Sequence, residues 1–235
     1  MPLFRQGMRD GIAIALGYLS VSFSFGILSV QSGLTVWQAV LISVTNLTSA
    51  GQVAGVGLIA AHASLTELFL AELIINIRYA LMSLVLSQKA DKSFRLPHCL
   101  LAAFGITDEI FAVASVRKDS LRPAYMYGLT FVPFIGWALG TLLGAAAGSV
   151  LPAQITNALG IALYGMFLAI ILPPARKSRP IFAVISVAAI LSVLLHYFAS
   201  WMSGGFAMIL AALAAAVFGA VVFPVSDETQ EVPEA

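Results

Sequence analysis

The stretch Thr45–Gly57, "TNLTSAGQVAGVG", decides how this chain is expected to fold. It holds an Asn, a Gln, two Thr, a Ser and three Gly in the middle of the apolar run 34–61, where the centre of a lipid bilayer is expected. As one straight helix this run would be about 42 Å long, whereas the hydrocarbon core of a bilayer is about 30 Å thick. The stretch therefore predicts a helix that is interrupted inside a membrane.

The composition of the whole chain indicates an integral membrane protein. Hydrophobic residues make up 60% of the 235 residues and charged residues 10%, and the mean hydropathy is +0.97. A soluble domain carries about 25% charged residues. The net charge of +1 gives no indication of nucleic-acid binding. The single cysteine, Cys99, provides neither a disulfide framework nor a thiolate metal cluster, and we expect no metal and no cofactor.

Six segments are long and apolar enough to be transmembrane helices. They are 12–30, 65–88, 124–148, 154–173, 180–199 and 204–223. Two further segments, 34–61 and 97–116, are ambiguous. We expect an all-α polytopic membrane protein with about six to eight transmembrane segments, in which one or both of the ambiguous segments are broken or re-entrant. Residues 1–223 are expected to form a single transmembrane domain, and residues 224–235 a short acidic cytoplasmic tail.

The positions of the basic residues bear on the orientation, because Lys and Arg are enriched on the cytoplasmic side. They cluster at Arg5/Arg9, Lys89/Lys92/Arg95, Arg117/Lys118/Arg122 and Arg176/Lys177/Arg179. If both ambiguous segments re-enter, every cluster is cytoplasmic; if both cross, the loop 89–95 faces outward. Either arrangement places the N and C termini in the cytoplasm.

The polar stretch itself is the first candidate site. Gly51 and the following glycines weaken the helix, and the polar neighbours can bond the backbone groups that are released. The N-terminus of a half-helix offers free N–H groups and partial positive charge, which suit a carboxylate. Secondary transporters build binding sites from such interrupted helices. We predict substrate binding by Asn46, Ser49, Gly51 and Gln52; the alternative is close helix packing through small residues.

Segment 65–88 carries the second candidate group. Glu72, Asn76 and Tyr79 fall on one helical face, and Arg78 lies roughly 120° away from Glu72. An ionisable residue at membrane depth normally faces the protein interior and finds a partner. We predict that Asn76 and Arg78 bind substrate and that Glu72 takes part in proton coupling or ammonium binding. Simple pairing with other helices is the alternative.

The third candidate group is Asp108 and Glu109 in "AFGITDEIFAVAS". Neighbours on a regular helix point about 100° apart and are not expected to serve one ligand. "TDE" is typical of a helix start after Gly105, so one carboxylate can cap the helix while the other faces a cavity. We predict a role for both in proton coupling or ammonium binding. The alternative is that one carboxylate caps the helix and the other is an interfacial charge.

Three motifs in this chain resemble those of the AzlC-type branched-chain amino-acid permeases, the large subunit of bacterial LIV-E exporters. They are "SAGQVAGVGLIA", "NIRYALMS" and "FGITDEIFAVAS", which occur in the family order. The likeness runs from about Gly11 to the last span and is strongest in the first half. Tyr79 stands where the family typically has His, and Ser24 where it usually has Pro.

The resemblance implies a transporter of the bacterial inner membrane that exports valine, leucine, isoleucine or similar small apolar amino acids such as methionine. It further implies that the proton gradient drives export and that a small AzlD-type membrane subunit is a partner. A channel for a small neutral or cationic solute and a structural subunit of a two-component transporter are the alternatives. No serine or metalloprotease motif occurs in the sequence, so no enzyme activity is expected.

Overall fold

The structure, a computed structural model, describes residues 2–148, 150, 152, 154, 165, 168, 171–199 and 201–224. Over these residues the chain is helical apart from its turns and loops, with one isolated β-bridge between Ala90 and Leu121. The predicted all-α polytopic membrane fold is confirmed. The chain divides into two compact units: unit 1 is Met1–His62 with Glu72–Met166, and unit 2 is Ala63–Ala71 with Phe167–Ala235.

Five helices in the described part of the chain are long and apolar enough to span a membrane. They are α1 (Pro2–Gln31), α4 (Leu65–Lys89), α7 (Pro123–Gly148), α9 (Arg179–Phe198) and α10 (Gly204–Val222). They agree with five of the predicted spans, except that α1 begins at Pro2 rather than near residue 12. The span predicted over 154–173 and the predicted tail lie largely outside the described residues.

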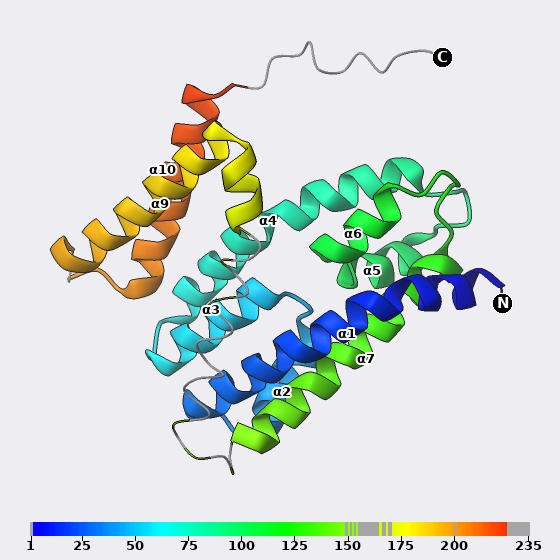
Figure 1. Ribbon diagram of the computed structural model, residues 1–235, viewed down its shortest axis with the longest axis horizontal. Coiled ribbons are helices and arrows are strands. Elements are labelled where there is room, and N and C mark those ends of the chain that lie inside the picture. Colours follow the sequence, from blue (N-terminus) through cyan, green and yellow to red (C-terminus); the bar gives the residue numbers. More distant parts are fainter. Residues whose placement is uncertain are drawn as a thin grey trace. The chain divides into compact units, whose positions relative to one another are not determined.

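Two parallel helices, α1 and α7, form the centre of unit 1 and lie side by side (Figure 1). Gly7 packs against Tyr125 at the start of α7, and Gly26 packs against Ala145 near its end, so both helices run in the same direction. A Cβ atom on Gly26 would lie 2.5 Å from the Ala145 nitrogen. Small residues are required here because they let two helix backbones approach closely inside a membrane.

Both ambiguous segments are broken helices, as predicted. The four half-helices are α2 (Val36–Thr45), α3 (Ser49–Ala60), α5 (Leu96–Phe104) and α6 (Asp108–Ser115). In each segment a threonine caps the second half-helix: the Thr48 hydroxyl accepts the Gly51 N–H, and the Thr107 hydroxyl accepts the Ile110 N–H. A threonine cap of this kind stabilises a helix start by about 1 kcal/mol. The local sequence therefore determines where each second half-helix begins.

The first break does not lie where the glycines suggested. Gly51, Gly55 and Gly57 are all inside α3, and the interruption covers residues 46–48 instead. The Thr48 cap, rather than glycine flexibility, is thus the local feature that begins α3. Gly51 provides space, because a Cβ atom there would lie 2.5 Å from Glu72 Oε2.

The two ends of the α5–α6 segment meet at one end of unit 1. The Asp91 N–H donates to the Leu121 carbonyl (2.9 Å), the Leu121 N–H donates to the Lys89 carbonyl (2.8 Å), and Arg122 pairs with Asp91 at 3.1 Å. Hydrogen bonds from Ser93, together with the Arg122 guanidinium, hold the pKa of Asp91 below its usual range. With nine and eight residues, neither α5 nor α6 can cross about 30 Å of hydrocarbon. The segment therefore enters and leaves on the same side.

This end of unit 1 also holds the start of α1, since Arg117 Nη2 lies 3.4 Å from Gln6 Oε1. The basic clusters at 5–9, 89–95 and 117–122 are consequently together at one end, here named the basic end. This is what the re-entrant arrangement of 97–116 requires.

The α2–α3 segment belongs to the opposite end. It follows the far end of α1 and leads into α4, which runs toward the basic end and stops there at Lys89. The two broken segments thus enter unit 1 from opposite ends. Each follows a long helix: α1 precedes α2–α3, and α4 precedes α5–α6. Residues 2–115 therefore form two halves with the same order of elements, one long helix followed by two half-helices, and with opposite direction.

Unit 2 contains the α9–α10 hairpin and the first residues of α4. Gly219 of α10 lies beside Val184 of α9. Glu67, in the first turn of α4, is 3% exposed, and its carboxylate accepts a 2.5 Å hydrogen bond from Ser203, the residue before α10. This contact ties the start of α4 to the hairpin.

Candidate functional site

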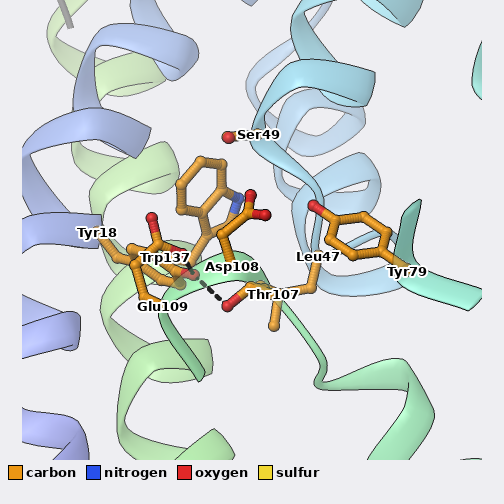
Figure 2. A pocket seen from close by; sticks show the side chains of 8 residues that line it. All are labelled: Tyr18, Leu47, Ser49, Tyr79, Thr107, Asp108, Glu109 and Trp137. Carbon is orange, nitrogen blue, oxygen red and sulfur yellow. Dashed lines mark hydrogen bonds between the residues drawn. The ribbon is translucent and has the colours of Figure 1, made fainter. Parts of the chain in front are cut away.

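The two breaks of unit 1 meet at a small polar cavity, named the central cavity here. Its lining residues come from α1, the first break and the start of α3, α4, the second break with the start of α6, and α7; they are Tyr18, Leu47, Ser49, Tyr79, Thr107, Asp108, Glu109 and Trp137. Figure 2 shows Tyr18 and Tyr79 on opposite sides of this cavity, with Asp108 between them. The site is therefore assembled from parts that are far apart in the sequence.

Glu109 is held by α1. The Tyr18 hydroxyl lies 2.6 Å from Glu109 Oε2 and 2.6 Å from Thr107 Oγ1 (Figure 2). A phenol has one proton and can donate to only one of these oxygens at a time. The Tyr18 ring packs edge-on against Trp137, with centroids 5.2 Å apart. Tyr18 thus fixes both the cap and the first turn of α6.

Asp108 is held by α4 instead. Arg78 Nη1 lies 2.9 Å from both oxygens of the Asp108 carboxylate. Both side chains are about two-fifths exposed, so water weakens the pair relative to a fully buried one. Arg78 also stacks on the Tyr79 ring, 5.0 Å from its centroid. A guanidinium and a carboxylate in contact are the two groups that could instead bind the two charged ends of an amino acid.

A second polar cluster surrounds the first break. Thr48 donates to Asn76 Oδ1 at 2.7 Å, and Asn76 Nδ2 donates to Glu72 Oε2 at 2.8 Å. The Asn46 side chain interacts with the Glu72 carboxylate as well. Gly51 faces both Glu72 and Asn76 closely. Sequence reasoning predicted roles for four of these residues, and the structure brings all four together.

Gln52 is buried beside the first break and does not line the central cavity. Its side chain is 1% exposed, and its carbonyl oxygen accepts hydrogen bonds from Trp137 Nε1 (3.1 Å) and Ser43 Oγ (3.3 Å). Its amide nitrogen donates to the Asn46 carbonyl, a backbone group that the break releases. The polar atoms of Gln52 are therefore occupied by protein, whereas Ser49 lines the cavity directly.

The contacts at the two breaks are arranged crosswise. Tyr18, from the long helix of the first half, contacts the Thr107 cap of the second half. Tyr79, from the long helix of the second half, lies 3.4 Å from the Thr48 cap of the first half. Each half thus stabilises the break of the other, and the central cavity lies between the two halves.

The central cavity is nearly closed. Its volume is only about 10 Å³, roughly what one water molecule needs. An amino acid does not fit without movement of the surrounding helices. Over the described residues, no group of three or more His, Cys, Asp or Glu side chains is placed to hold a metal ion.

Some residues of the site were not found from the sequence. Tyr18, Ser43, Trp137 and Thr141 are single polar or aromatic residues in apolar helices, and no motif marks them; Ser43 and Thr141 bond to each other at 2.7 Å. Asp108 and Glu109 both line the central cavity, and whether they serve one ligand stays a prediction. They lie in the first turn of α6, where different partners hold them.

Comparison with known proteins identifies the family. The family model described as AzlC protein matches residues 13–151, which include both broken segments. The chain belongs to the AzlC family. The resemblance of the three motifs is thereby confirmed.

Two relatives are similar over most of their length. This AzlC protein is 32% identical over 190 residues to an uncharacterized membrane protein of Archaeoglobus fulgidus, covering 80% of this chain and 83% of that protein. It is 28% identical over 184 residues to the inner membrane protein YgaZ of Escherichia coli, covering 75% of each. No solved structure matches the chain. AzlC membership and the apolar helices identify a multi-pass membrane protein, which fits a membrane transporter.

Proposed function

We propose that this protein is a secondary transporter of the bacterial inner membrane that exports branched-chain or similar small apolar amino acids in exchange for protons. One observation carries the proposal. Two half-helices, capped by Thr48 and Thr107 and entering from opposite ends, converge on a polar cavity beside the Arg78–Asp108 ion pair. Inverted halves with broken helices at their interface are the common architecture of secondary transporters.

The charged groups supply partners for a zwitterion. In the proposed role, Arg78 binds the α-carboxylate, helped by the polar groups of Asn46, Ser49 and Asn76 and by the N–H groups at the start of α3 near Gly51. Asp108 binds the α-ammonium group when Arg78 releases it. The substrate thereby replaces the Arg78–Asp108 pair with two equivalent pairs, so no charge is left unpaired in the membrane.

Glu72 and Glu109 are proposed to serve proton coupling. Glu72 accepts a hydrogen bond from the neutral amide of Asn76, and Glu109 accepts one from the hydroxyl of Tyr18. A carboxylate with neutral partners can gain a proton without breaking an ion pair, whereas Asp108 cannot. Gln52 is proposed to act by holding the break in shape.

The near-closed cavity supports a carrier over a channel, because a continuous pore would need an open path for the solute. A small AzlD-type membrane subunit is the proposed partner. The basic end of unit 1 is proposed to face the cytoplasm, following the preference of Lys and Arg for that side.

The test is uptake of labelled leucine, valine and methionine into everted vesicles after imposing an inward-acidic pH gradient, with and without an AzlD-type subunit. We expect saturable uptake that an uncoupler abolishes. Arg78→Ala should reduce leucine uptake at least about tenfold, which corresponds to the loss of one charge-assisted contact. Arg95→Ala is the matched control, because Arg95 is exposed before α5 and makes no cap hydrogen bond.

Equal loss of uptake in both arginine variants would reject the role of Arg78 in the site. A large flux without saturation would show a channel instead. Absence of uptake of any amino acid with every partner tested would reject the export proposal.

A further inference from the structure

A second cavity of unit 1 lies on the basic side of the second break. It has a volume of about 220 Å³ and lies between the end of α4, the α5 half-helix, the loop residues of the basic end and the start of α7. Its walls are mainly apolar, with Leu86, Phe94, Ala102, Ala103, Ile106 and Met126 among the lining residues. We name it the apolar cavity.

The apolar cavity and the central cavity lie on either side of the second break. Ile106 lines the apolar cavity, and the next residue, Thr107, lines the central cavity. Beside the break, Thr130 Oγ1 is buried without a hydrogen-bond partner among the described residues. It lies 2.6 Å from the position that a Cβ atom on Gly105 would take, so this glycine lets α7 pack closely against the second break.

The two cavities have complementary chemistry. The central cavity offers charges and hydroxyls but only about 10 Å³, whereas the apolar cavity offers space with few polar groups. An aliphatic side chain gains about 0.8 kcal/mol for each buried methylene. A cavity of roughly 150 Å³ with apolar walls already accommodates a benzene molecule, so about 220 Å³ suffices for a leucine or methionine side chain.

We propose that the apolar cavity is the subsite for the aliphatic side chain of the substrate when it arrives from the basic end, with the charged end directed at the second break. This inference rests on the proposed transport of amino acids and assigns the side-chain subsite that the central cavity lacks. The cavity reaches Ala90 and Leu121 in the loops of the basic end, which is the side from which an exporter takes its substrate. An occupied subsite would place the amino acid next to Asp108 before the break moves.

The chain carries a natural reporter for this test. Its only cysteine, Cys99, is exposed and lines the apolar cavity. We would measure the rate at which N-ethylmaleimide labels Cys99 in vesicles that contain the full chain, with leucine or with glycine at the same concentration. Leucine should slow labelling at least about threefold, and glycine should not. Equal rates with both amino acids would overturn the proposal, and labelling blocked in lipid but not in detergent would indicate an acyl chain as the occupant.

Two variants of α5 test the subsite through selectivity. Cys99→Phe fills the cavity, whereas Leu100→Phe adds the same ring at an exposed neighbour that does not line the cavity and serves as the control. We expect Cys99→Phe to lower leucine uptake at least about tenfold relative to alanine uptake, because a pocket discriminates roughly 10–200-fold for each methylene. Unchanged selectivity in a normally inserted Cys99→Phe protein would overturn the proposal while leaving the transport function intact. Protection of Cys99 by leucine without any uptake would reject the transport function but not the subsite.

Discussion

Gln52 offers the sharpest test of how the first break is held together. Gln52→Leu keeps the approximate volume of the side chain but removes all its polar atoms. The Trp137 N–H and the Asn46 carbonyl then lose their partner, while Ser43 keeps its hydrogen bond to Thr141. A buried polar group left unsatisfied costs about 1–3 kcal/mol.

Two such groups give an expected loss of about 2 kcal/mol in the free energy of unfolding. This value takes the lower limit for each group, because hydrogen bonds inside membrane proteins average about 0.6 kcal/mol. The assay is reversible unfolding of the purified protein in mixed micelles by SDS titration, followed by circular dichroism. A double-mutant cycle with Trp137→Phe isolates the contact between the two side chains. We expect a coupling free energy of about 0.6–1.7 kcal/mol.

A coupling free energy within about 0.3 kcal/mol of zero, the usual error of additivity, would refute the reasoning. It would mean that Trp137 does not bond to Gln52 in the membrane. Full stability of Gln52→Leu on its own would show further that the released Asn46 carbonyl has another partner.

Three further outcomes are expected. Gly26→Leu should abolish accumulation of folded protein, because a Cβ atom at this position already meets the backbone of α7, whereas Gly17→Leu, with no atom within 4 Å of its Cβ position, should accumulate normally on a membrane immunoblot. Tyr18→Phe should lower the maximal rate of uptake about fivefold, since the second break loses one hydrogen bond worth about 1 kcal/mol; an unchanged rate would argue against a role for this contact. Ser93→Cys in a Cys99→Ala background should react with an impermeant maleimide in everted vesicles but not in intact cells, and labelling in intact cells would place the basic end outside.

The sequence was sufficient for five of the six predicted spans and for the breaks in both ambiguous segments, because each signal is local. Polar residues inside the run 34–61 and the carboxylates inside 97–116 are anomalous at membrane depth whatever surrounds them. The exact position of the first break was missed, because Gly51 can serve either flexibility or close approach, and only the position of Glu72 distinguishes the two. Helix starts set by Thr48 and Thr107 depend on one hydroxyl each.

The contacts of the site between residues far apart in the sequence could not be predicted. Tyr18 pairs with Thr107, which is 89 residues away in the sequence, and Trp137 pairs with Gln52, which is 85 residues away, so only the packing of the helices brings them together. Nothing in the sequence near Tyr18 differs from an ordinary interfacial or packing tyrosine. The grouping of Glu72, Asn76 and Gly51 was partly predictable, since helical spacing already placed Glu72 and Asn76 on one face.

The parallel pairing of α1 and α7 has a consequence for biogenesis. A ribosome completes α7 only after it has made α2 to α6, and at roughly 5–20 residues per second α1 waits in the membrane for several seconds without its partner. During that interval its small-residue face, with the buried Ser22 and Ser29, is open to any neighbouring helix. A nascent chain beside another copy could then pair its α1 with the other copy's α7, which is the route to domain-swapped dimers. Overexpression, which crowds nascent chains, should therefore raise the yield of such dimers more steeply than that of folded monomer.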